Sequence, residues 1–252
     1  MDIASLNAAA AAGRESSQTR VSGSADAAAQ AFQKADQRLQ QQRNQVSVEV
    51  SSAGKLKAAF SQAQAASTAL GDVKQTSTDA GVTKAANNFV KAFNSVAKTA
   101  RSATTQKGAL AGANLAHAAE NNLLRTVSAD STAKSELKKI GIAQQNDGTL
   151  ALDARKFEAA LKANSEAVRN TLSSVGEKVD RTTTRELANT GNLGKSESLL
   201  DNRATNLENQ QAAQQAQAAA AQQTISTRTA DLNKSLNNLN TGAAAYQRVF
   251  SL

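Results

Sequence analysis

Three groups of residues in this sequence could carry chemistry, and none has the partners that it would need. His117 is the only histidine, and the chain has no cysteine that could share a metal ion with it. Residues 189–196 (NTGNLGKS) resemble a phosphate-binding loop, but Asn189 stands where the first glycine should be, and no apolar strand precedes it. The carboxylates are dispersed, and the serines have no base to activate them. We therefore expect no enzyme, cofactor or metal site.

The clearest local structure is expected at residues 137–161, LKKIGIAQQNDGTLALDARKFEAAL. Ile140 and Ile142 alternate with a glycine, and Leu150 and Leu152 alternate with an alanine, which indicates two short, half-buried strands. The pattern therefore predicts a small β-hairpin over residues 140–152.

Two turns could close this hairpin at Asn146-Asp147-Gly148. A two-residue Asp-Gly turn would pair Gln145 with Leu150 and place the isoleucines and leucines on opposite faces. A three-residue loop with Gly148 in the left-handed region pairs Ile142 with Leu152 and gathers all four side chains on one face. We predict the three-residue loop.

A helix should follow the hairpin at once. Asp153 is a suitable N-cap, because its carboxylate can accept from free backbone N–H groups at the positive end of the helix dipole. Leu152 and Phe157 then occupy the two positions of a hydrophobic staple. The expected structural site is made of Ile140, Ile142, Gly148, Leu150, Leu152, Asp153 and Phe157.

The remaining sequence predicts helices. The chain has 252 residues, no proline and only 3% aromatic residues, which indicates long uninterrupted helices that pack closely through small side chains. We expect a mostly α fold, namely an elongated helical bundle or coiled coil of the N- and C-terminal helices with one small β-hairpin. Between the long helices, we expect helices from Asp79, which would be the N-cap, to about Arg101, and at 114–128 and 131–139. Another should run from Asp153 to a stop at Asn164-Ser165, where a new N-cap begins a further helix that reaches about Asn189.

The two ends of the chain should pair as antiparallel helices. The first long helix should begin near Ser24 or Ala25, with Phe32, Leu39 and Val46 seven residues apart. The last should run from near Lys195 to about Asn238. Its apolar positions form two series of seven-residue steps, and we interpret the change of phase between them as a stutter. The two series are Leu200, Leu207 and Gln214, and then Ile225, Leu232 and Leu239.

These expectations divide the chain into three parts. Residues 1–24 are expected to be disordered, residues 25–240 to form the helical core, and residues 241–252 to be a C-terminal assembly segment. Tyr246, Val249 and Phe250 in the last part could be a frayed tail or an anchor that docks onto a neighbour, and the sequence leaves both open.

Charge and hydropathy narrow the possible partners. The net charge of +8 could attract nucleic acid or an acidic surface. However, Lys and Arg are scattered singly among carboxylates, and no aromatic residues lie between them for base stacking, which disfavours nucleic acid. No apolar run is long enough for a transmembrane helix, so we expect no membrane insertion. The N-terminal segment MDIASLNAAAAAG lacks the basic start of a secretory signal.

The hairpin region resembles the C-terminal core of the flagellar hook-associated protein 2 family, the filament-capping proteins. The family pattern is an Ile-Gly-Ile strand, an Asp-Gly turn, a Leu-x-Leu-Asp strand end and a Leu-rich helix. It is met here by Ile140, Gly141, Ile142, Asp147, Gly148, Leu150, Leu152, Asp153, Leu161 and Val168.

The flanking segments are similar to the same family in the same order. They include Gly54, Leu56 and Lys57, then Phe89, Val90 and Asn94 with Phe93 in place of a tyrosine, and the C-terminal RATNLENQ and LNNLNTGAAAYQ. The similarity covers roughly residues 36–250. The large β-rich outer domains of full-length members are absent, and a loop at residues 71–80 takes their place.

The resemblance implies a structural subunit of the bacterial flagellum. Such a subunit would be exported by the flagellar secretion system, would lie outside the cell at the distal filament end, and would oligomerise there to support flagellin assembly. Its partners would be further copies of itself, flagellin, hook–filament junction proteins and the export chaperone and apparatus. Candidate assembly residues are Phe32, Leu39, Leu232, Leu239, Tyr246, Val249 and Phe250. The alternative is a cytoplasmic basic coiled-coil binding module, either nucleic-acid associated or secretion-regulatory.

Overall fold

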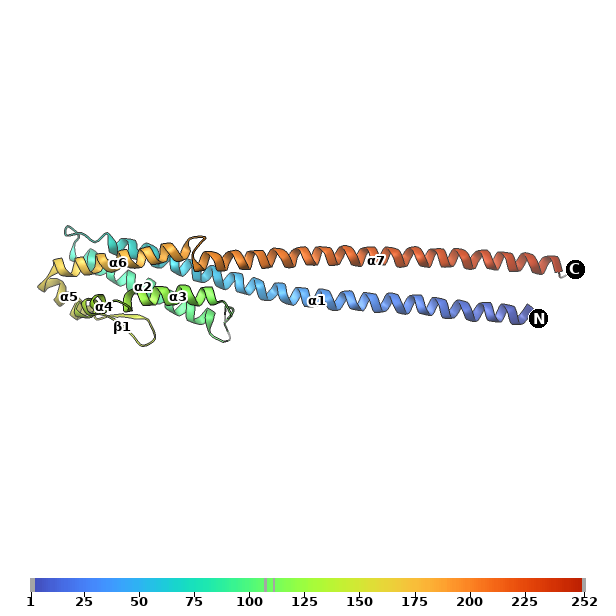
Figure 1. Cartoon of the computed structure of the whole chain (residues 1–252), viewed down its shortest axis with the longest axis horizontal. Coiled ribbons are helices and arrows are strands. Elements are labelled where there is room, and N and C mark those ends of the chain that lie inside the picture. The colour runs from blue at the N-terminus through green and yellow to red at the C-terminus, as the bar shows by residue number, and fades with distance from the viewer. Residues whose placement is uncertain (1–2, 107, 111, 251–252) are drawn as a thin grey trace. The chain divides into compact units, whose positions relative to one another are not determined.

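The computed structural model describes residues 3–106, 108–110 and 112–250, and it is mostly α-helical with one small antiparallel sheet, as the sequence predicts (Figure 1). The elements are α1 (Ile3–Gly71), α2 (Asp79–Thr104), α3 (Asn114–Ser128), α4 (Ser131–Lys139), β1 (Ile142–Gln144), β2 (Leu150–Leu152), α5 (Ala154–Ala163), α6 (Ser165–Leu187) and α7 (Asn192–Phe250). The chain forms two compact units. We call residues 44–204 the core unit and residues 1–43 with 205–252 the end unit, so that α1 and α7 contribute to both.

The core unit is a helical bundle with a continuous apolar interior. Apolar residues of α2 recur every three to four positions, so they share one face of the helix, and that face is buried as predicted. Within the bundle, α3 contacts both α2 and α6. The largest fully buried side chains include Phe60 of α1, Phe89 and Phe93 of α2, Phe157 of α5 and Leu172 of α6.

Helix α6 approaches the end of α1 so closely that a glycine is required. A Cβ atom at Gly176 would lie only 2.4 Å from the backbone nitrogen of Gly71. Ser173, one turn earlier on α6, donates a hydrogen bond of 2.7 Å to the Gly71 carbonyl. Backbone contact, and not a layer of large side chains, therefore sets the position of α6 at this point.

Helix α2 begins differently from the prediction. The N-cap is Thr78, whose hydroxyl accepts from the backbone N–H of Gly81 at 3.1 Å, and Asp79 is the first helical residue. The Asp79 carboxylate instead accepts from Nη2 of the buried Arg169 at 2.7 Å, and the same nitrogen donates to the Ser77 carbonyl. The prediction of Asp79 as N-cap was wrong because this acidic side chain is engaged by α6.

Helix α7 also begins before its predicted start near Lys195. Its first residue is Asn192, whose backbone N–H and side-chain amide both donate to the Glu186 carboxylate, at 3.2 and 2.8 Å. Asn122 of α3 donates to the other oxygen of this buried carboxylate. A carboxylate from α6 thus accepts a hydrogen bond from a free backbone N–H at the start of α7. The local sequence could not indicate this contact.

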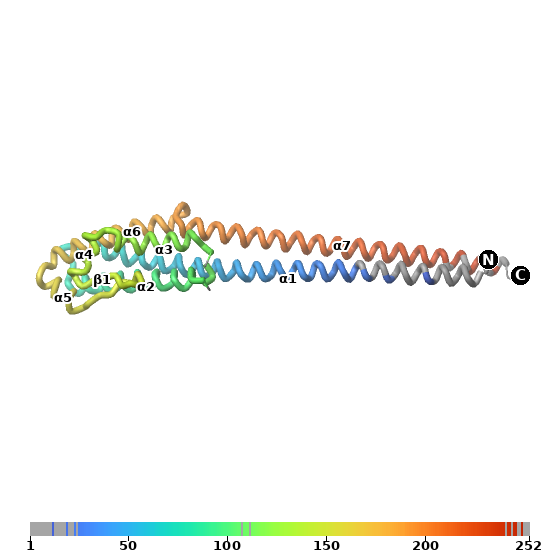
Figure 2. The backbone as a smooth tube through the Cα atoms, turned by 60° about the horizontal axis from the view of Figure 1, so that its bottom comes forward, coloured from blue at the N-terminus to red at the C-terminus, as the bar shows by residue number. Residues whose placement is uncertain are grey.

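The end unit consists of two antiparallel helical segments, which lie side by side in both views (Figures 1 and 2). Arg43 of α1 donates to Gln211 and lies 3.9 Å from the carboxylate of Glu208. Further toward the N-terminus of α1, the Phe32 carbonyl accepts from Gln214 at 3.2 Å. Residues nearer the N-terminus of α1 contact residues nearer the C-terminus of α7. This order confirms that the two segments are antiparallel. Val46, by contrast, belongs to the core unit and is buried there.

A single heptad seam runs along the end unit, and the predicted stutter is wrong. The half-buried and buried positions follow steps of three and four residues, as in a coiled coil. They are Ala25, Ala28, Phe32, Ala35 and Leu39 on α1, and Leu207, Gln211, Gln214, Ala218, Ala221 and Ile225 on α7. Ala218 and Ala221 continue the seam from Gln214 to Ile225, so the heptad phase does not change between the two predicted series.

The outer limits of the long helices also differ from the prediction. Helix α1 begins at Ile3 and not near Ser24, and α7 continues to Phe250 and does not stop near Asn238. Both extensions lack proline and are rich in alanine, and a single glycine such as Gly242 costs only about 1 kcal/mol within a helix. The division into a disordered segment, a core and an assembly segment stays a prediction.

Paired cysteines test the antiparallel seam in a chain without native cysteine. Because the side chains of Arg43 and Gln211 are in contact, we expect Arg43→Cys with Gln211→Cys to be bridged within one chain by a short bismaleimide. The control pair, Arg43→Cys with Ile225→Cys, places the second thiol two heptads further along α7, about 21 Å away at 1.5 Å per residue. Gel mobility under denaturing conditions measures both. Bridging of the control, or bridging only between chains, would contradict the arrangement.

Candidate functional site

The β-hairpin forms with the predicted register and loop. Ile142 pairs with Leu152, Ala143 with Ala151 and Gln144 with Leu150. Gly148 has a φ of 77°, and its N–H donates to the Gln145 carbonyl at 3.0 Å. The three-residue loop is confirmed, because a two-residue turn would have shifted every pair. Ile142 and Leu150 are buried in the core, and Leu152 packs against it.

One residue of the predicted hairpin lies outside the sheet. Helix α4 runs to Lys139, and Ile140 is its C-cap, so Ile140 is not a strand residue as we predicted. Gly141 follows with a φ of 89°, the left-handed conformation that often ends helices. Ile140 is nevertheless buried in the same apolar core as Ile142, and the Gly141 carbonyl accepts from Asp153 N–H at 2.8 Å. Ile-Gly-Ile is thus a helix end and the first strand residue.

The predicted helix cap after the hairpin is confirmed. Asp153 has an extended backbone, and its Oδ1 accepts from the Lys156 N–H at 3.1 Å. Phe157 is fully buried on the next turn, and Leu152 is half-buried before the cap, as the staple requires. The chain direction from β2 into α5 is therefore determined by these three residues.

A residue that the motif analysis did not assign a role completes the hairpin. Asn94 of α2 donates from its amide nitrogen to the Leu150 carbonyl at 2.8 Å and accepts from the Leu150 N–H at 2.6 Å. One side chain thus makes both hydrogen bonds that a neighbouring strand would otherwise make at this position. The only signal in the sequence was that Asn94 lies in the segment similar to the hook-associated protein family.

The hairpin loop is held by charge as well as by its turn. The Asp147 carboxylate accepts from both the backbone N–H and the hydroxyl of Thr149, and these hydrogen bonds lower the pKa of Asp147. Arg101 at the end of α2 lies 3.7 Å from the same carboxylate and donates to the Asp147 carbonyl. Helix α2 therefore contacts the hairpin at its loop and at its second strand.

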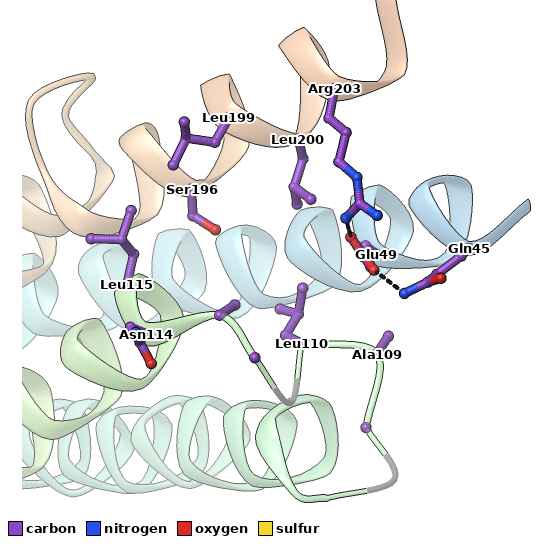
Figure 3. Close-up of a pocket in the computed structure, with 13 residues that line it drawn as sticks. Gln45, Glu49, Ala109, Leu110, Asn114, Leu115, Ser196, Leu199, Leu200 and Arg203 are labelled. Carbon is purple, nitrogen blue, oxygen red and sulfur yellow. Dashed lines mark hydrogen bonds and ion pairs between the residues drawn. The ribbon is translucent and has the colours of Figure 1, made fainter. Parts of the chain in front are cut away.

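An apolar pocket of about 650 Å³ opens elsewhere on the core unit, between α1, the segment before α3 and the start of α7 (Figure 3). Leu110, Leu115 and Leu200 line it, and Leu199 at its edge is 61% exposed. An ion pair of 3.0 Å between Glu49 and Arg203 forms its polar rim, and Gln45 donates to Glu49. The pocket offers an apolar contact surface, which the sequence did not indicate.

The predicted assembly residues whose side chains the structure describes differ in their exposure. Phe32 and Leu39 are half-buried in the seam of the end unit, whereas Leu232 and Leu239 of α7 are 38% and 63% exposed. The backbone of Tyr246, Val249 and Phe250 belongs to α7, but their side chains lie outside the described residues. An assembly role for these residues stays a prediction.

The residues that could have carried catalysis, metal binding or phosphate binding have structural positions in the fold. His117 is half-buried on α3, and within the described ranges no three His, Asp or Glu side chains come together as metal ligands. Residues 189–196 form the turn before α7 and its first residues, and the Glu186 carboxylate accepts from the Asn192 N–H, where a bound phosphate would otherwise have to lie. Among the helices described, none is long and apolar enough to cross a membrane.

Comparison with known proteins identifies one family. The model of the family described as "Flagellar hook-associated protein 2 C-terminus" matches residues 62–248. The match includes the hairpin, Asn94, Asp153 and most of α7. No curated protein matches the chain.

Removal of the Asn94 amide should destabilise the core unit. We expect Asn94→Ala to lower the free energy of unfolding by about 1–3 kcal/mol, because Leu150 would lose partners for both of its backbone groups. Asn88→Ala is the matched control, since Asn88 is exposed on the same helix, and it should change stability by less than about 0.5 kcal/mol. Urea unfolding measures both variants. If both variants lose the same free energy of unfolding, the two hydrogen bonds between Asn94 and Leu150 contribute nothing to stability.

A branched residue at the hairpin loop should also be costly. Gly148→Val forces a β-branched side chain into positive φ, and its Cβ would lie 3.2 Å from Cδ1 of Leu124. We expect a loss of about 1–3 kcal/mol in a thermal melt. Gly112→Val is the control, because a Cβ there meets nothing within 4 Å and the residue has no positive φ. A neutral Gly148→Val would mean that the loop tolerates another turn.

Proposed function

Since the chain belongs to the flagellar hook-associated protein 2 family, we propose that it is a structural subunit of the filament cap of the bacterial flagellum. The observation that carries this proposal is the family match over residues 62–248, which includes the hairpin and the side chain that completes it. The chemistry of the site agrees with a structural role, because its polar side chains are engaged in caps, turns and strand pairing. We propose no reaction.

The proposed subunit is exported by the flagellar secretion system and oligomerises at the distal end of the filament, outside the cell. Its partners there would be further copies of itself, flagellin and the hook–filament junction proteins, with an export chaperone engaged beforehand. Support comes from the exposed apolar side chains that a solitary subunit would leave in water, namely Leu199 beside the pocket and Leu239 on α7.

The connection between α1 and α2 bears on what such a subunit would do. It is a short loop from Asp72 to Thr78, which the Arg169 guanidinium holds through the Ser77 carbonyl. Full-length members of the family that the chain resembles carry their outer β-rich domains at this place. We therefore propose that this chain contributes the inner, helical part of a cap and none of the functions of such outer domains.

The second candidate is a cytoplasmic basic coiled-coil module that binds nucleic acid or regulates secretion. The observation in its favour is the net charge of +8 together with the heptad seam of the end unit. Location separates the two candidates. A cap subunit is expected in sheared filament fractions, whereas a module confined to the cytoplasm and bound to DNA at near-physiological salt would overturn the cap proposal.

Removal of the C-terminal segment should separate assembly from folding. A chain truncated after Asn240 loses Tyr246, Val249 and Phe250, whose large apolar side chains are the proposed assembly contacts. We expect it to keep the melting temperature of the core unit, which ends at residue 204, but to lose oligomers in light scattering and to fail to support filament growth.

A chain truncated after Phe250 is the matched control and should assemble normally. If the chain truncated after Asn240 also assembles normally, the segment is not an assembly contact. If its core unit melts at a lower temperature, the segment contributes to folding and not to assembly alone.

A further inference from the structure

Two helical stretches of the core unit contain basic residues and no acidic residue. Residues 50–71 of α1 and residues 80–104 of α2 contain no Asp and no Glu. The same two stretches contain Lys55, Lys57, Lys84, Lys91, Lys98 and Arg101. Elsewhere in the core unit acidic residues stand among the basic ones in the sequence, and some of them pair, as Glu177 does with Arg181. Any carboxylate that compensates the charge on the face formed by these two stretches must therefore come from another element.

Two of these cations are paired with carboxylates of other elements. Lys57 pairs with Glu197 of α7, and Arg101 pairs with Asp147 of the hairpin loop. Within the part of the chain that the structure describes, the remaining lysines form no ion pair. These are Lys55, Lys84, Lys91 and Lys98, all of them exposed. We call this set the lysine row.

The lysine row has a regular spacing. Lys84, Lys91 and Lys98 follow one another every seven residues, so they lie along one stripe of α2, about 10.5 Å apart at 1.5 Å per residue. Lys55 of α1 meets the end of this stripe, because Lys55 and Lys98 line the same hollow of about 370 Å³. Ser52, Thr99 and Ser102 also line the hollow and add hydroxyl groups that can donate hydrogen bonds.

We propose that the lysine row is a docking surface for an acidic helix of a partner protein. A helix whose carboxylates recur once or twice per heptad presents them with the same repeat of about 10.5 Å, so that each can meet one lysine. The hollow would receive a carboxylate between Lys55 and Lys98, where the hydroxyl groups complete its hydrogen bonds. The charge on the face supplies both the attraction and the register.

The face fits a protein better than a nucleic acid. Base recognition on single strands requires exposed aromatic side chains, and the aromatic residues of α2, Phe89 and Phe93, are both buried in the core. The inference goes beyond the proposed function, because it concerns one face of the core unit and does not depend on where the protein assembles. Its test reads binding and not filament growth.

The experiment measures binding of a defined peptide to the full chain. The probe is a labelled helical peptide of three heptads with glutamate at the first and fourth position of each and Ala or Gln elsewhere. A second peptide has the same composition with its glutamates distributed around the helix. Fluorescence anisotropy at 50 and 300 mM salt should show tighter binding of the first peptide and weakening of that binding by salt.

Two charge-matched variants locate the binding surface. Lys84→Gln/Lys91→Gln/Lys98→Gln should weaken binding of the first peptide about tenfold, the combined effect of three exposed ion pairs. Lys134→Gln/Lys138→Gln/Lys139→Gln removes the same charge from exposed positions on α4 and should change the affinity less than about twofold. Both variants should keep the melting temperature of the unchanged protein, because the exchanged lysines form no ion pair among the described residues.

Four results would overturn the proposal. The first is no binding of either peptide at 50 mM salt, and the second is an equal loss of affinity in both variants. The third is tighter binding of a DNA duplex that only the lysine-row variant loses, which would assign the face to nucleic acid. The fourth is self-association of the chain that only this variant loses, which would make a second copy the occupant.

Discussion

The small β-sheet depends on one amide side chain that reaches it from a helix. An isolated two-stranded hairpin is marginally stable in water, because each strand leaves one row of backbone groups unpaired. Asn94 supplies both missing hydrogen bonds at Leu150, and the two ends of the hairpin are fixed by the Gly141 turn and the Asp153 cap. The hairpin thereby connects α2, α4 and α5, and its apolar face closes one side of the core. The helices are positioned by a sheet too short to persist without them.

A second constraint is that the helices meet through small residues and buried polar contacts. At the end of α1, Gly176 allows backbone contact with Gly71, and two turns earlier Arg169 of α6 reaches the loop before α2. This guanidinium is almost fully buried, and its Nε has no partner among the described residues, so that within this part of the chain its desolvation is offset by Ser77 and Asp79. Such contacts add little apolar area, but they tolerate few alternatives. These contacts therefore specify how the helices pack in a chain that has few large side chains to do so.

How far the sequence predicted the structure depended on the range of each interaction. The loop register, the Asp153 cap and most helix boundaries in the core were correct, because period, turn chemistry and capping act within a few residues. Thr78 displaced Asp79 as a cap because Arg169, far along the chain, engages that carboxylate. Asn94 was missed as a hydrogen-bonding residue for the same reason, since its partner Leu150 lies on another element. The supposed stutter failed differently, because alanines belong to the seam but carry too little hydrophobic signal to be counted.

The end unit and the core unit are stabilised in different ways, and the difference bears on assembly. In the core unit phenylalanine and leucine fill the interior, whereas the seam of the end unit consists largely of alanine and glutamine. Apolar stabilisation follows the area removed from water, so each turn of this seam contributes much less than a turn of the core. Long helices gain most of their stability from such packing and not from propensity. The end unit therefore has more to gain from a neighbouring chain than the core unit has, and Leu232 and Leu239, exposed on its surface, are the side chains that a neighbour could cover.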